Sequence, residues 1–337
     1  MKSKSLTFIV IYIYFACIPL LASKILIITH NYNSPDFVEI QFESFKKFLK
    51  DAYEYVVFND ASDKKLADMI DQKCNKLGIK CIRIPQENRT SPNTPIDILT
   101  YRFWAGLRHA EAISYSLNIL GFNYPGIVMM IDSDMFLIKN FCVSKYLENY
   151  DIAGLLQIKE DRVHFLWAGL LMFNMNKLPD KETMQFKGGI IEDVLCDTGG
   201  SLHYYLKKHP ELKIRNFEQQ YRLFLDENFG LYAINNVTSP SINPVFHPKC
   251  NKCQLSHATC THTADILKEF GINQIIINNI LEKEFIPKSE FVMQDTFLHY
   301  QSVSNWDNKD QVFLNEKMRQ LKNFLQKIGL KFNDIPV

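Results

Sequence analysis

The chain has 337 residues, of which 47% are hydrophobic, enough for one large core or for a core with a small subdomain. This argues against extended disorder. Its 38 Lys and Arg residues balance 37 Asp and Glu residues, which leaves no general attraction to nucleic acid or to anionic membranes. We expect no nucleic-acid partner, and any phosphate binding must come from local groups or a metal.

The first 22 residues differ from the rest of the chain. Lys2 and Lys4 precede an uncharged apolar run over residues 6–22, which ends in small residues. This pattern predicts a secretory signal peptide. The run is just long enough to cross a bilayer, so an uncleaved anchor that associates the protein with a membrane is the alternative. In both cases we expect a protein of the secretory pathway or an exported one.

Strand-like and helix-like segments then alternate along the chain. The pattern predicts an α/β domain over residues 23–310, with a mostly parallel central sheet flanked by helices, and an amphipathic C-terminal helix within residues 311–337. We expect strands over residues 24–30, 53–58, 80–84, 152–156 and 166–173, and a buried strand that ends at the Asp132-Ser133-Asp134 triplet within the apolar segment 126–138. We expect helices over 37–49, 64–77, 96–120, 202–208 and 309–328.

Seven cysteines follow the apolar run, and export would permit disulfides among them. Cys250, Cys253 and Cys260 lie with three histidines in a loop-like segment over about residues 245–265. Their spacing fits a zinc site or a loop held by disulfides, and the exported context favours disulfides. The remaining four are Cys74, Cys81, Cys142 and Cys196.

The most informative segment is 126–138, an apolar run with Asp132 and Asp134 at its centre and Ser133 between them. Buried strands do not normally hold two carboxylates. On an extended segment, side chains two residues apart point the same way, so both carboxylates can converge on one divalent cation. Such a cation commonly completes its shell with substrate phosphates, which predicts a nucleoside diphosphate as ligand.

This triplet, its preceding strand and a late His-Tyr pair at His299 together resemble the GT-A glycosyltransferases, and among them the glycogenin-like family, over about residues 24–306. The resemblance implies a Rossmann-like nucleotide-diphospho-sugar transferase fold. It also implies a hexosyltransferase that uses Mn²⁺ or Mg²⁺ and moves a sugar from a nucleoside-diphosphate donor, expected to be a UDP-sugar. The acceptor would be a glycan, a protein or a lipid.

The resemblance also implies roles for single residues. Asp132, Asp134 and His299 would bind the metal, and Trp306 accompanies the histidine. Residues of the first strand and the helix before the aspartates would contact the nucleotide. These nucleotide-binding candidates are Thr29, His30, Asn31, Tyr32, Asp60, Arg102 and Ser133.

Trp167 and Gly169 resemble the strand near the donor sugar in related transferases, and with Trp306 they would line the sugar and acceptor site. Asp193 or Asp197 would bind donor hydroxyls or act as the acceptor base. The family pattern has Asp-Gln in this region and Lys-Pro-Trp near the end, where this chain has Ser-Asn-Trp. Retention or inversion of the sugar is therefore left open.

Two other classes compete with a transferase. A haloacid-dehalogenase-like phosphatase also carries Asp-x-Asp after an apolar strand. In that class the motif normally continues with Gly or Thr and lies near the N-terminus. Here Met135 follows the motif, which lies in mid-chain. An exported metal-binding or interaction protein could hold a structural cation on the same carboxylates. Nucleotide binding that depends on a metal distinguishes the transferase from both.

Overall fold

The computed structural model describes residues 24–87, 89–91, 98–217, 219–226, 230–236, 290–293, 296–300 and 311–332. The predicted signal segment and the Cys/His-rich segment lie outside these ranges and stay predictions. Within the described part of the chain, no helix has the length and the apolar character needed to cross a membrane.

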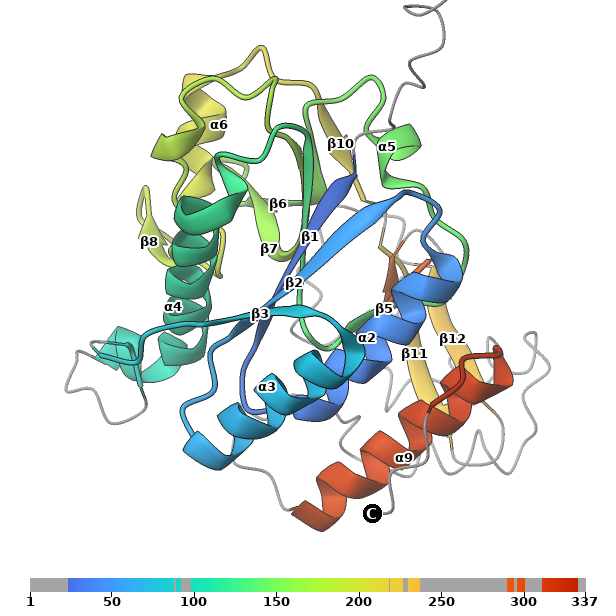
Figure 1. Cartoon of the computed structure of the whole chain (residues 1–337). Helices are drawn as coiled ribbons and strands as arrows, with labels where there is room; N and C mark the ends of the chain where they lie inside the picture. The colour runs from blue at the N-terminus through green and yellow to red at the C-terminus, as the bar shows by residue number, and fades with distance from the viewer. Residues whose placement is uncertain are drawn as a thin grey trace, which may run out of the picture.

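A seven-stranded sheet forms the centre of the molecule, in the order β10-β6-β7-β4-β1-β2-β3 (Figure 1). All neighbouring pairs are parallel except those that β7 makes with β4 and β6. The predicted α/β class with a mostly parallel central sheet is confirmed. Its strands are β1 (Ile25–Asn31), β2 (Tyr53–Asn59), β3 (Lys80–Arg83), β4 (Ile127–Ile131), β6 (Ile152–Lys159), β7 (Val163–Asn174) and β10 (Ile214–Asn216).

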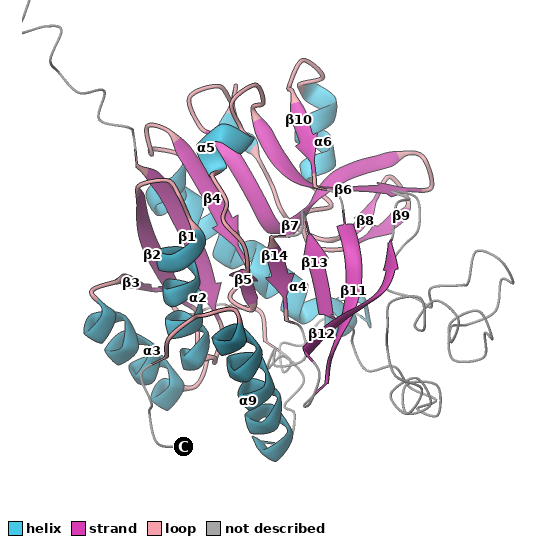
Figure 2. Cartoon of the chain, turned by 90° about the vertical axis from the view of Figure 1, so that its right-hand side faces the viewer, coloured by secondary structure: helices cyan, strands magenta, loops and turns pink. Residues whose placement is uncertain are grey.

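A second, antiparallel sheet has the order β12-β11-β13-β14-β5 (Figure 2). The single extended segment expected over residues 126–138 is divided between the two sheets, because the chain turns at the aspartates after β4 and re-enters as β5. The strands of the second sheet are β5 (Met135–Leu137), β11 (Gln219–Asp226), β12 (Gly230–Asn236), β13 (Glu290–Met293) and β14 (Phe297–His299), and a separate hairpin consists of β8 (Gly189–Ile191) and β9 (Val194–Cys196).

Helices cover both faces of the central sheet (Figures 1 and 2). Side chains alternate along β1: Ile25 and Ile27 pack in the core cluster that includes α2, α3 and α9, and Leu26 and Ile28 in the cluster of α4 and α6. Burial on both faces explains why β1 is apolar without interruption. The helices are α2 (Pro35–Phe48), α3 (Lys64–Leu77), α4 (Ile98–Ser116, continued by the π-helical segment Leu117–Gly121), α5 (Val143–Tyr146), α6 (Leu202–Lys208) and α9 (Gln311–Lys327).

The helix boundaries follow local signals in the sequence. Pro35 occupies the first turn of α2, where its missing N–H costs no hydrogen bond. Asp63 caps α3 by accepting a hydrogen bond from the Leu66 amide at 2.9 Å, and Gly78 ends that helix in the left-handed conformation at φ 68°. These signals place α3 at the predicted residues, 64–77.

Candidate active site

The site lies where the strand order of the central sheet reverses. From β1 the chain passes through α2 to β2 on one side, and from β3 it returns through α4 to β4 on the other. The carboxyl ends of β1 and β4 therefore lie side by side with their connections leaving in opposite directions. In open α/β sheets, ligands bind in the crevice outside these ends.

Asp132 and Asp134 occupy a tight turn at the carboxyl end of β4. The Asp132 amide donates to the Gly169 carbonyl at 2.8 Å, and the Met135 amide closes the turn on the Asp132 carbonyl at 3.1 Å. The Tyr300 amide donates to the Asp134 carbonyl at 2.8 Å. Main-chain hydrogen bonds from both sheets thus fix the turn. The two carboxylates converge because of this turn, and not because they lie on one extended strand.

The structure brings Asp132, Asp134 and His299 together. One ligand atom from each lies within 4.8 Å of the others, and His299 Nε2 is 3.3 Å from Asp134 Oδ1. His299 reaches the turn because β14 pairs with β5, which places His299 opposite Met135. Two carboxylates and an imidazole are a donor set that suits Mn²⁺ and related divalent ions.

The electrostatics of the group also favour a cation. Burial raises the pKa of the Asp132 carboxyl above its ordinary value, and the neighbouring carboxylates of Asp134 and Asp197 add to the rise, while His109 and His299 oppose it. The charges of Asp134 and Asp197 thus disfavour a negative charge on Asp132. A divalent ion would remove that repulsion.

Gly169 permits a close approach beside the aspartates. A Cβ built on it would lie 2.5 Å from Asp132 Oδ2 and would overlap the Trp167 ring. The Trp167 ring in turn packs on the His299 ring, with 5.1 Å between their centroids. The predicted sugar-site residues Trp167 and Gly169 therefore border the carboxylate–histidine group directly.

The two candidate acids lie at opposite ends of the β8–β9 hairpin. Asp193 forms its turn with a left-handed φ of 65°, whereas Asp197 directly follows β9 at the open end. Asp197 is exposed, and its charge acts on Asp132. Its Oδ1 accepts the Thr198 amide at 2.7 Å. Of the two, Asp197 is the one near the aspartate turn.

The predicted nucleotide-binding residues at the end of β1 make hydrogen bonds within their own loop, to the end of β4 and to the loop after β2. The Thr29 hydroxyl donates to the Ile131 carbonyl at 2.8 Å, and the Asn31 amide group donates to the Ser34 carbonyl at 2.9 Å. Tyr32 shares a hydrogen bond of 3.0 Å with Ser62. The side chain of His30 is buried.

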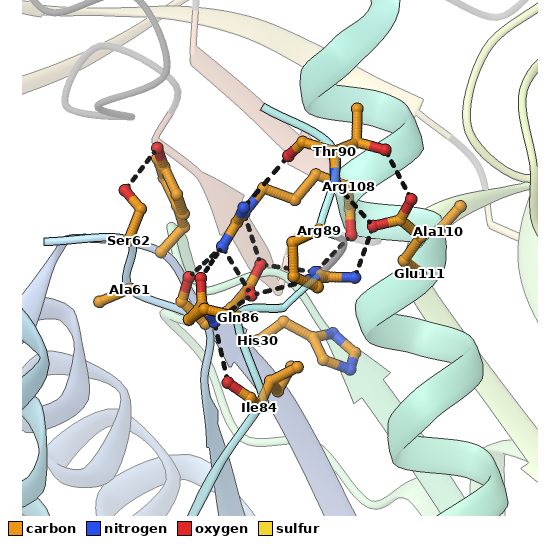
Figure 3. A network of polar contacts seen from close by, with 12 residues as sticks. His30, Ala61, Ser62, Ile84, Gln86, Arg89, Thr90, Arg108, Ala110 and Glu111 are labelled. Carbon is orange, nitrogen blue, oxygen red and sulfur yellow. Dashed lines mark hydrogen bonds and ion pairs between the residues drawn. The ribbon is translucent and has the colours of Figure 1, made fainter. Parts of the chain in front are cut away.

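Asp60 is buried in an ion-pair network at the end of β2. Arg108 from α4 donates to both of its carboxylate oxygens at 2.9 Å, and Arg89 donates to Oδ2 at 2.8 Å. Arg89 also contacts Glu111 at 2.7 Å. Figure 3 shows Arg89 and Arg108 among the polar contacts of this network. The carboxylate thereby ties the residues before α4 to the sheet.

Three further predicted residues are placed less closely. Ser133 is half-buried between the two aspartates. Arg102 belongs to α4, but its side chain lies outside the described part of the structure, as does the whole of Trp306. The roles assigned to these residues stay predictions.

Two polar residues at the site were missed from the sequence. His109 of α4 reaches Asp132, with 3.1 Å between Nε2 and Oδ1. Gln41 of α2 donates to the carbonyls of Asp132 and Met135 at 2.7 and 2.9 Å, and so clamps the aspartate turn. Gln41 interrupts the buried face of an amphipathic helix, a signal that could have pointed to it. His109 carries no such signal.

No protein-family model matches the chain, and no curated protein does. Similar solved structures include the mannosyltransferase PcManGT from Pyrobaculum calidifontis in complex with GDP-Man and Mn²⁺ (12% identity, 57% of this chain, 54% of that one, TM-score 0.37). Core-mannan synthase A from Aspergillus fumigatus in its Mn/GDP form is another (9% identity, 47% of this chain, 62% of that one, TM-score 0.32). Glucosyl-3-phosphoglycerate synthase from Mycobacterium tuberculosis in complex with Mn²⁺ and UDP is a third (14% identity, 58% of this chain, 69% of that one, TM-score 0.34).

The chain matches little more than half the length of the first two of these structures. At identities of 9–14% and TM-scores below 0.5, the likeness assigns no family.

Proposed function

We propose that the protein is a metal-dependent glycosyltransferase of the GT-A type, which moves a hexose from a nucleoside-diphosphate sugar to a glycan, protein or lipid acceptor. One observation carries the proposal: Asp132, Asp134 and His299 converge within 4.8 Å outside the carboxyl ends of β1 and β4. The three residues come from both sheets, and the place is the one where open α/β sheets bind nucleotides.

In this account Asp134 and His299 hold Mn²⁺ or Mg²⁺, and Asp132 contacts the metal or the ribose. The bound ion would neutralise charge on the departing nucleoside diphosphate. Trp167 offers an aromatic face to the sugar beside the metal ligands. Asp197 is exposed, and in this proposal it binds donor hydroxyls or accepts the proton of the acceptor hydroxyl.

Calorimetry with UDP and GDP, with and without Mn²⁺, tests the proposal against its two rivals. We expect UDP or GDP to bind only when Mn²⁺ is present, and we expect Asp134→Asn to abolish that binding. Binding of Mn²⁺ by a chain that binds neither nucleotide under any condition would favour an interaction protein. Release of phosphate from phosphomonoesters would favour a phosphatase.

A further inference from the structure

The Asp132 carboxylate has two distinct environments, one for each oxygen. Oδ1 lies 3.1 Å from His109 Nε2, and Oδ2 lies on the side of Gly169. A Cβ added to Gly169 would meet both Oδ2 and the Trp167 ring, and that ring packs on His299. Oδ2 therefore faces the residues that border the metal group, while Oδ1 is engaged from α4.

His109 is itself supported by a buried histidine, His30. The two rings meet edge to face, with 5.6 Å between their centroids. His30 Nε2 is 2.8 Å from the Ser116 hydroxyl, whose single hydrogen is donated to the Ile113 carbonyl at 2.9 Å. His30 Nε2 must therefore carry the proton and donate to Ser116, which fixes its ring orientation.

His30 was predicted to contact the nucleotide, but its ring packs on His109. Its imidazole is buried, and burial lowers its pKa well below the usual value, with His109 and Arg89 adding to the effect. Figure 3 shows the His30 ring beside Arg89, turned toward the helix of Glu111. His109 thus packs edge to face against a buried ring whose orientation is fixed by Ser116.

We propose that His109 is a positioning residue for Asp132: its Nε2–H holds Oδ1 and so keeps Oδ2 directed toward the metal. Groups that hydrogen-bond to a metal ligand fix its orientation and its basicity, and their loss typically weakens metal binding about 10- to 100-fold. This inference rests on the proposed function, since it requires a divalent ion on Asp132.

The test measures Mn²⁺ alone, by electron paramagnetic resonance of the free ion titrated into the full chain. His109→Leu should raise the Mn²⁺ dissociation constant about 10- to 100-fold. His109→Gln, which keeps an N–H donor at similar reach, should restore most of the affinity. His109→Asn stays polar but is too short, and should behave as His109→Leu does. His164→Leu, which removes an exposed imidazole from β7, is the matched control.

Thermal unfolding of each variant separates positioning from general damage. Weakened Mn²⁺ binding in His109→Asn at an unchanged unfolding midpoint supports the role. Wild-type affinity in both His109→Leu and His109→Asn overturns it, and so does a His109→Gln defect as large as that of His109→Leu. A wild-type chain that binds no Mn²⁺ would remove the proposed metal site, whereas tight wild-type binding with indifferent variants removes the His109 role alone.

Discussion

The substitution Gly169→Ala examines the close packing beside the aspartates. Its Cβ would lie 2.5 Å from Asp132 Oδ2 and nearer still to the Trp167 ring, so one or both must move. Such overpacking costs roughly 1–3 kcal/mol of unfolding free energy. Because Trp167 packs on His299, the displacement reaches two members of the metal group, and we expect Mn²⁺ affinity to fall about 10-fold or more.

Gly154→Ala is the matched control in the same sheet. Its Cβ would meet Leu171 Cδ2 at 2.7 Å, the end of a flexible side chain, and the nearest atoms around it belong to leucines and not to the aspartates. We expect a stability loss without a change in Mn²⁺ affinity. The assay is urea unfolding of both variants, together with Mn²⁺ titration followed by electron paramagnetic resonance.

A double variant identifies which contact matters. Trp167→Leu removes the ring from the path of the new Cβ at position 169 but leaves Asp132 Oδ2 at 2.5 Å. The pair Trp167→Leu with Gly169→Ala should therefore recover stability more than Mn²⁺ affinity. Wild-type Mn²⁺ binding in Gly169→Ala itself would refute the reasoning, because the turn would then tolerate the added methyl group.

Three further outcomes follow from buried and exposed groups. Because the pKa of His30 is lowered in the folded protein, the unfolded chain takes up a proton at higher pH than the folded one does. The free energy of unfolding should therefore fall by up to ~1.4 kcal/mol for each pH unit below about pH 6.5. In urea unfolding at several pH values, His30→Gln should show a weaker dependence of this free energy on pH than the wild type. Arg108→Met leaves buried Asp60 with one fewer partner and should cost about 3–5 kcal/mol by equilibrium unfolding; a loss under 1 kcal/mol would contradict the network. Asp197→Asn should lower the rate of sugar transfer, by about 10²–10⁴ if it is the base, and more than Asp193→Asn does; equal rates would argue against the placement of Asp197.

Much of the central sheet could be predicted from the sequence, because its local signals agree with its packing. The strand over residues 24–30 is apolar throughout, and β1 is buried on both faces. The helix over 64–77 has a capping Asp63 and a terminating Gly78, and α3 has these bounds. Helix-capping residues and hydrophobic periodicity agree here, so the bounds of the helix follow from local sequence.

The second sheet could not be predicted in the same way. Its order joins β5 to β14 across more than 150 residues, and no local pattern encodes such a pairing. The segment 126–138 was expected to stay extended through the aspartates because apolar residues flank them on both sides. The turn at Asp132 depends on Gln41 and on β14, which are remote in sequence.

Contacts between residues remote in sequence also determine which site residues could be predicted. Asp132 and Asp134 could be singled out because carboxylates in an apolar segment conflict with burial. His299 was reached only through a family resemblance, and the structure places it beside Asp134. His109 was missed because a histidine in a long helix has no property that reveals which strand it faces.

The central claim is tested most directly by incubating the full chain with a panel of UDP- and GDP-sugars and following release of the nucleoside diphosphate. The account predicts slow hydrolysis of at least one donor, lost on addition of EDTA, restored by Mn²⁺, and absent from Asp134→Asn that remains folded. Hydrolysis that persists in EDTA or in Asp134→Asn would contradict a metal-dependent transferase centred on the aspartate turn.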